Sequence, residues 1–155
     1  MSERLTRILF ITATRLGDAV LSTGLLDYLL QSVPDPQITI ACGPVAAGLF
    51  ERMPGRTRTI IVEKQRYDLH WWSLWRTCIG TRWDLAIDLR GSAVTLLLRT
   101  KGRSIMRGGR RAGHRINHLG GVLGLDPAPV PVVWTSEADD AKAASSRNTA
   151  PSMLA

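Results

Sequence analysis

One stretch near the start of the chain, residues 7–24, most constrains its fold. An apolar run over residues 8–11 is followed by a short turn and then by a helical pattern, with an acid, Asp18, in the first helical turn. This order predicts the first strand, loop and helix of a Rossmann-like α/β domain, whose ligands gather at the carboxyl ends of the strands. We therefore expect the carboxylate of Asp18 to point into that ligand crevice.

Further apolar runs of strand length alternate with helical patterns along the chain. The expected strands cover residues 8–11, 38–42, 59–62, 85–89 and, more weakly, 104–106. The expected helices cover residues 18–33, 45–52, 70–79, 92–99 and 116–123. Such alternation is typical of a parallel sheet covered on both faces. The sequence thus predicts the α/β class, with a Rossmann-like parallel sheet flanked by helices.

A length of 155 residues suits one domain. We expect residues 1–134 to form it, with a last short strand at 132–134 after a Pro-rich connection. The remaining residues, 135–155, are rich in Ala, Ser and charge and lack the periodicity that builds a core. They are expected to be a linker or a disordered tail.

The net charge of +7 is concentrated in one segment. Between residues 99 and 115 there is no acid, while the bases are Arg99, Lys101, Arg103, Arg107, Arg110, Arg111 and Arg115. A local basic excess favours an anionic partner. Sugar phosphates, anionic lipid and nucleic acid all fit this charge, and Arg56, Arg58, Lys64 and Arg66 are expected to extend the same basic wall.

Several classes of protein fit the sequence poorly. No run of apolar residues is long enough to span a membrane, and the N-terminus lacks the pattern of a secretory signal. Cys42 and Cys78 have no metal-binding spacing, so reduced thiols in a cytoplasmic protein are expected. His114 and His118 lie four residues apart without a third ligand, so we predict no metal site.

Three segments, in order, resemble a known family. Residues 15–26 read RLGDAVLSTGLL, residues 38–44 read ITIACGP, and residues 83–92 read WDLAIDLRGS. Together they resemble the ADP-heptose:lipopolysaccharide heptosyltransferases, glycosyltransferase family 9, over roughly residues 5–134.

The resemblance implies one half of a GT-B architecture, in which the N-terminal Rossmann-like domain holds the acceptor sugar and a C-terminal domain binds the ADP-sugar. This chain corresponds to the N-terminal half, and the donor-binding domain is absent from it. We therefore expect an acceptor domain that binds a lipopolysaccharide-core saccharide, is inactive alone and needs no cofactor. The turn after the first expected strand has a single glycine, which argues against NAD or FAD.

By the same resemblance, Asp18 is the catalytic base. It would take a proton from the acceptor hydroxyl in an inverting single displacement, with ADP leaving. The alternative is that Asp18 only complements the dipole at the helix start, an effect of about 0.3–1 kcal/mol.

The remaining candidate residues are expected to bind the acceptor. They are Thr14, Arg15, Gly17, Asp88, Arg90, Ser92, Arg107, Arg110 and Arg111. Gly17 would allow close approach of a ligand, and guanidinium groups suit phosphates and carboxylates. Structural alternatives stay open: Arg15 as an exposed arginine, Asp88 in a strand-end salt bridge, Ser92 as a helix cap, and the arginines as a solvated face.

An aromatic and basic cluster, residues 70–76, has two interpretations. Trp71 and Trp75 share a helix face, which favours core packing. Tryptophan is also enriched at membrane interfaces, which would place the chain peripherally at the inner membrane. The arginine segment has no interleaved aromatics, so a nucleic-acid partner is not expected. The alternative to an enzyme half is a non-catalytic Rossmann-like module that binds an anion or a partner chain.

Overall fold

The computed structural model describes residues 6–63, 69–106 and 114–149, with the backbone only for 147–149. Its centre is a five-stranded, wholly parallel sheet in the order β3-β2-β1-β4-β5. The strands are β1 (Thr6–Ile11), β2 (Pro36–Cys42), β3 (Arg56–Ile61), β4 (Trp83–Asp88) and β5 (Thr100–Ile105). All five expected strands are therefore confirmed, and each starts earlier than expected.

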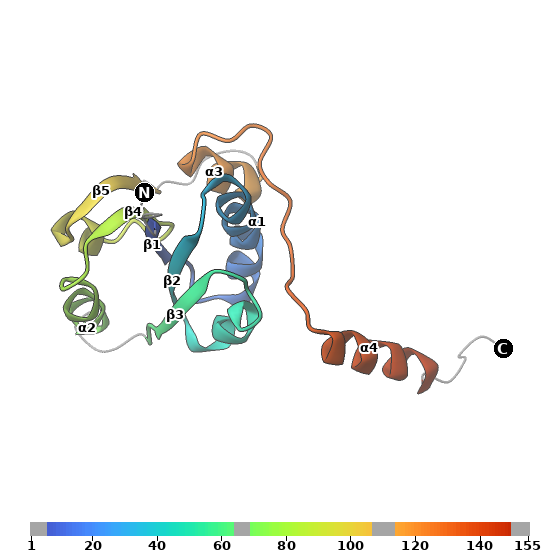
Figure 1. Ribbon diagram of the computed structural model, residues 1–155. Helices are drawn as coiled ribbons and strands as arrows, with labels where there is room; N and C mark the ends of the chain where they lie inside the picture. Colours follow the sequence, from blue (N-terminus) through green and yellow to red (C-terminus); the bar gives the residue numbers. More distant parts are fainter. Residues whose placement is uncertain (1–5, 64–68, 107–113, 150–155) are drawn as a thin grey trace.

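Helices cover both faces of the sheet (Figure 1). The α-helices are α1 (Leu16–Ser32), α2 (Leu69–Cys78), α3 (Arg115–Val122) and α4 (Glu137–Thr149), and the 3-10 helices are η1 (Pro44–Phe50) and η3 (Ala93–Leu97). The five expected helices are confirmed, although two of them are short 3-10 turns. The prediction of an α/β, Rossmann-like sheet flanked by helices is confirmed.

Two apolar clusters sandwich the sheet. Alternate β1 residues, Ile8 and Phe10, face α1, η1 and α3, whereas Leu9 and Ile11 face α2 and η3. All four are completely buried, as expected for the central strand of a parallel sheet. Cys42 and Cys78 lie buried as free thiols, and burial raises the pKa of each to about 11.

The segment after α3 returns across the outside of α1 without forming a strand (Figure 1). The backbone N–H of Val132 donates to the hydroxyl of Thr23 over 2.9 Å. A Cβ on Gly24 would lie only 2.6 Å from the carbonyl oxygen of Pro129, so glycine alone lets the two backbones meet. The predicted strand at 132–134 is wrong because these residues pack on a helix and reach no sheet edge.

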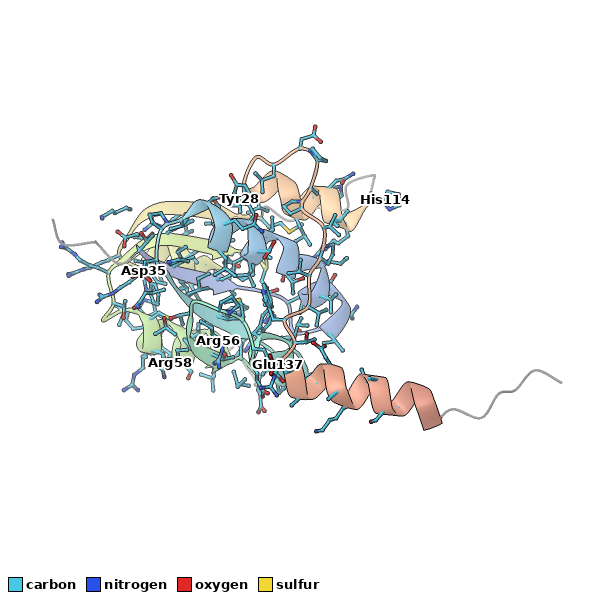
Figure 2. The ribbon with its side chains drawn as sticks, turned by 45° about the vertical axis from the view of Figure 1, so that its right-hand side comes forward. Tyr28, Asp35, Arg56, Arg58, His114 and Glu137 are labelled. Atoms are coloured by element: carbon cyan, nitrogen blue, oxygen red, sulfur yellow. The ribbon has the colours of Figure 1, made fainter. Side chains whose placement is uncertain are left out.

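Where the sequence predicts a linker or disordered tail, residues 137–149 instead form α4, which projects from the sheet domain (Figures 1 and 2). Ser136 and Asp139 form a reciprocal cap: the Ser136 N–H donates to Asp139 Oδ2 over 3.0 Å, and the Asp139 N–H to Ser136 Oγ over 3.3 Å. Arg52 Nε lies 2.7 Å from Asp139 Oδ2 and ties the helix start to the domain. The linker role of this region stays a prediction.

Replacing Gly24 with alanine tests the crossing over α1. The added methyl would press on the backbone of 129–130, so Gly24→Ala should lower the free energy of unfolding by about 1–3 kcal/mol in urea denaturation. The matched control is Gly121→Ala on α3, where a Cβ meets nothing within 4 Å. The control should be neutral or gain up to about 1 kcal/mol from helix propensity. Equal stability of the two variants would contradict the close packing.

Candidate functional site

The strand order defines where a ligand crevice lies. β2 and β4 flank β1 on opposite sides. The connection that leaves β1 leads to β2 on one side, and the connection that leaves β4 leads to β5 on the other side. The two connections therefore diverge between β1 and β4. Open parallel sheets bind ligands at such a switch point, outside the carboxyl ends of the strands. Ile11 and Asp88 are paired there, and the N–H of Leu89 donates to the Ile11 carbonyl over 2.9 Å. The candidate residues of the first and fourth strands therefore follow neighbouring strand ends.

The turn from β1 into α1 is held by buried hydroxyls. The oxygens Thr12 Oγ1 and Ser22 Oγ lie 2.8 Å apart, and Ser22 donates to the Ala19 carbonyl over 2.7 Å. A Cβ on Gly43 would approach the Cα of Thr14 to 2.7 Å, so the end of β2 packs tightly against this turn. Thr14 thus sits in a fixed backbone, while its side chain is only half-buried.

Asp18 lies in the first turn of α1 and stays accessible, with its side chain 35% exposed. Arg115 of α3 approaches it, but Arg115 Nε is 3.6 Å from Asp18 Oδ1, beyond ordinary hydrogen-bond distance. Arg15 precedes the helix as its exposed N-cap residue, without a side-chain cap. The space that a Cβ on Gly17 would occupy is open. This helix start is therefore an accessible surface with one carboxylate and two guanidinium groups.

Asp88, in contrast, is completely buried at the end of β4. Its Oδ1 accepts the backbone N–H of Arg90 over 2.9 Å, and its Oδ2 accepts the hydroxyl of Ser92 over 2.6 Å and, more weakly, that of Thr95 over 3.5 Å. Among the described residues it forms no salt bridge. Asp88 and Ser92 thus shape the β4–η3 turn, and their side-chain oxygens are engaged in hydrogen bonds within that turn. Ser92 is the N-cap residue of η3, but its side chain caps no helix N–H.

The turn that Asp88 organises presents Arg90. The guanidinium carbon of Arg90 lies 4.6 Å from the centre of the Trp71 ring on α2, within cation–π range. Partial burial lowers the pKa of Arg90, and the nearby carboxylate of Asp88 offsets part of this effect. The sequence indicated Trp71 as a packing residue or as part of a membrane-interface cluster. The sequence does not show that α2 lies beside the end of β4, so the contact between Trp71 and Arg90 could not be predicted from it.

Two bases of the basic segment, Lys101 and Arg103, make contacts within the domain. Lys101 pairs with Asp84 over 2.5 Å, and Arg103 donates to the carbonyls of Thr95 and Leu98, each over 2.8 Å. Lys101 therefore ties β5 to β4, and Arg103 ties β5 to η3 and its C-cap residue. Arg107, Arg110 and Arg111 lie outside the described residues, so their acceptor-binding role stays a prediction.

The expected extension of the wall by Arg56 and Arg58 is wrong. Both are on β3 (Figure 2), at the opposite edge of the sheet from β5. Lys64 and Arg66 lie outside the described residues.

Among residues 6–63, 69–106 and 114–149, no group of acids, histidines and cysteines is arranged to hold a metal ion. The helices of these ranges include none long and apolar enough to cross a membrane. A hollow of about 340 Å³ lies at the amino-terminal edge of the sheet, with Arg7, Gln37, Arg58 and Thr77 among its lining residues. This hollow lies at the amino-terminal ends of the strands, whereas the switch point lies at their carboxyl ends.

A five-stranded parallel sheet of this order, flanked by helices, matches one Rossmann-like half of a GT-B glycosyltransferase. The chain is similar in structure to a family 9 glycosyltransferase from Veillonella parvula, with a TM-score of 0.67 and 18% identity over 94% of this chain and 50% of that one. It also resembles E. coli ADP-heptose lipopolysaccharide heptosyltransferase II, with a TM-score of 0.63 and 18% identity over 94% and 52% of the two chains. The E. coli heptosyltransferase WaaC with ADP gives a TM-score of 0.59 and 14% identity over 80% and 49%.

The likeness to family 9 heptosyltransferases is thus confirmed at the level of the fold. The chain spans about half the length of these enzymes. No family model matches the sequence, and no curated protein matches it.

Removing the Asp88 carboxylate tests its structural role. Asp88→Ala leaves the Ser92 hydroxyl and the Arg90 N–H without their acceptor in a buried turn, so the free energy of unfolding should fall by about 2–4 kcal/mol in denaturant titration. Asp27→Ala is the control, because that carboxylate accepts only an exposed hydrogen bond from Gln31 on α1. A loss for Asp88→Ala no greater than for the control would show that the turn does not depend on the carboxylate.

Proposed function

We propose that this chain is the acceptor-side half of a heptosyltransferase-like glycosyltransferase of the cytoplasm. It would hold an anionic lipopolysaccharide-core saccharide while a second domain holds the ADP-sugar donor. The observation that carries the proposal is the accessible carboxylate of Asp18, at the first β-α turn of a fold shared with these enzymes. One of them, E. coli WaaC, is described with ADP and with an ADP-heptose analogue, which supports a sugar-nucleotide donor.

Asp18 is the catalytic base in this proposal. Among the described residues, no group donates a hydrogen bond to its side chain, and the nearest cation is 3.6 Å away. The carboxylate therefore keeps a free lone pair for the acceptor hydroxyl. As that oxygen attacks the anomeric carbon of the donor, the proton passes to Asp18 and the bond to ADP breaks, with inversion of configuration.

The acceptor would be held on both sides of the switch point. Thr14, Arg15 and Gly17 contribute the β1–α1 side, and Arg90 contributes a positioned cation from the β4 side. Asp88 and Ser92 act through the shape of the turn that carries Arg90. The guanidinium groups of Arg107, Arg110 and Arg111 would bind further phosphates or carboxylates of the acceptor.

Turnover tests the base assignment once the chain is joined to a donor-binding half. Asp18→Asn keeps the size of the side chain but removes its basicity, so release of ADP should slow by about 100- to 10,000-fold. Asp27→Asn changes a half-buried acid further along α1; it is the matched control and should keep full activity. Retained turnover in the Asp18 variant would exclude the base role, and a joined protein with no turnover at all would favour a non-catalytic binding module.

Calorimetric binding of a soluble lipopolysaccharide-core oligosaccharide tests the acceptor side. Arg90→Ala and the triple reversal of Arg107, Arg110 and Arg111 to Glu should each weaken acceptor binding by about tenfold or more, since each loses charge-assisted hydrogen bonds. In the joined protein, ADP-sugar affinity should stay unchanged. Arg52→Ala, which removes a base far from the switch point, is the control. Unchanged acceptor affinity in both variants would mean that the arginines are a solvated face, and salt-sensitive DNA binding would favour a nucleic-acid role.

A further inference from the structure

The outer side of α2 and η3 exposes several large apolar side chains. The two elements bury Leu74, Cys78, Val94 and Leu98 against the same face of the sheet. Their outward side chains include four large apolar residues that are more than half exposed: Leu69 at 54%, Trp72 at 59%, Leu96 at 62% and Leu97 at 66%. We call these four residues the outer apolar patch.

The patch differs from ordinary scattered exposure. Val45, Val130 and Val133 are also exposed, but they lie on η1 and on the segment that crosses α1. The four patch residues lie on two elements that contact each other. Clustered apolar exposure marks an interaction surface more often than isolated side chains do. Trp72 is also stacked on Trp75 at 4.8 Å, so its ring is held in place without being covered.

Among residues 69–106, the exposed charges around the patch are positive. Arg76 follows Trp72 by one helical turn, and Arg82 and Arg99 are exposed beyond the ends of α2 and η3. Neither α2 nor η3 contains an acid. Of the two acids between residues 69 and 106, Asp84 pairs with Lys101 and Asp88 is buried. A partner for this surface therefore needs apolar groups beneath a layer of negative charge.

From this combination we infer that the outer apolar patch docks on the surface of an anionic lipid bilayer. Tryptophan rings favour the level of the lipid headgroups. Leucine side chains gain by leaving water for the acyl boundary, and arginines at the rim bind anionic headgroups. Both elements are too short to span a membrane, so docking would be peripheral.

Docking there would bring the membrane close to the candidate site. α2 begins beside the carboxyl edge of the sheet, after β3, and Trp71, next to Trp72, holds Arg90 at the switch point. A lipid-anchored saccharide would then enter from the membrane side. This last step rests on the proposed function, whereas bilayer binding does not.

Vesicle binding by the full chain tests the inference. Sedimentation with phosphatidylcholine vesicles containing phosphatidylglycerol should capture the chain, while pure phosphatidylcholine should capture at least about tenfold less. Replacing Trp72, Leu96 and Leu97 with serine should weaken binding to the anionic vesicles by at least about tenfold. The matched control replaces Val45, Val130 and Val133 with serine, which removes similarly exposed apolar groups elsewhere, and it should bind like the unmodified chain.

The remaining outcomes are also decisive. Arg76→Glu with Arg99→Glu should weaken binding without touching the apolar groups, which keeps the test valid if the serine variant does not fold. No binding to anionic vesicles, or equal losses in patch and control variants, would overturn the inference. So would a chain that self-associates through the patch and ignores vesicles. Two variants separate failure of bilayer binding from failure of the proposed function. The Asp18→Asn variant should bind vesicles like the unmodified chain, and the serine variant should still bind the soluble saccharide.

Discussion

The rest of the structure depends on the complete burial of residues 8–11 of β1 between two apolar clusters. Ile8 and Phe10 fill one cluster, and Leu9 and Ile11 fill the other, so the strand has no face that tolerates water. Because β2 and β4 pair with it on opposite sides, β1 also fixes the switch point of the sheet. Sliding β1 by one residue would exchange the two faces and move the turn that follows it. The position of Asp18 is therefore a consequence of core packing.

The two turns that flank the switch point are built differently. The β1–α1 turn uses hydroxyl groups internally and leaves its carboxylate accessible, whereas the β4–η3 turn uses its carboxylate internally and leaves a cation accessible. A buried Asp88 is tolerated because neighbouring N–H and O–H groups solvate it. The end of β1 is thus followed by an accessible carboxylate, and the end of β4 is followed by an exposed cation.

The sequence predicted the fold well because buried parallel strands are continuous apolar runs, and their alternation with helices leaves few topologies. It failed where the outcome depended on spatial neighbours. The expected wall joined Arg56 to the basic segment, but strand order puts β3 and β5 at opposite edges. Helix α4 has no apolar periodicity, and only the capping pair of Ser136 and Asp139 signalled its start. The roles of Asp88 and Trp71 depend on side-chain direction, which a linear pattern does not contain.

The basic character of the chain has another consequence at the rims of the sheet. The strands at both rims carry cations, Arg56 and Arg58 on β3 and Lys101 and Arg103 on β5. An open strand otherwise offers unpaired peptide groups to any similar strand it meets. When the edge strands of two copies meet, their positive charges repel each other. This repulsion disfavours pairing of the strands into a continuous intermolecular sheet. Charge on the edge strands thereby helps to protect the chain against aggregation.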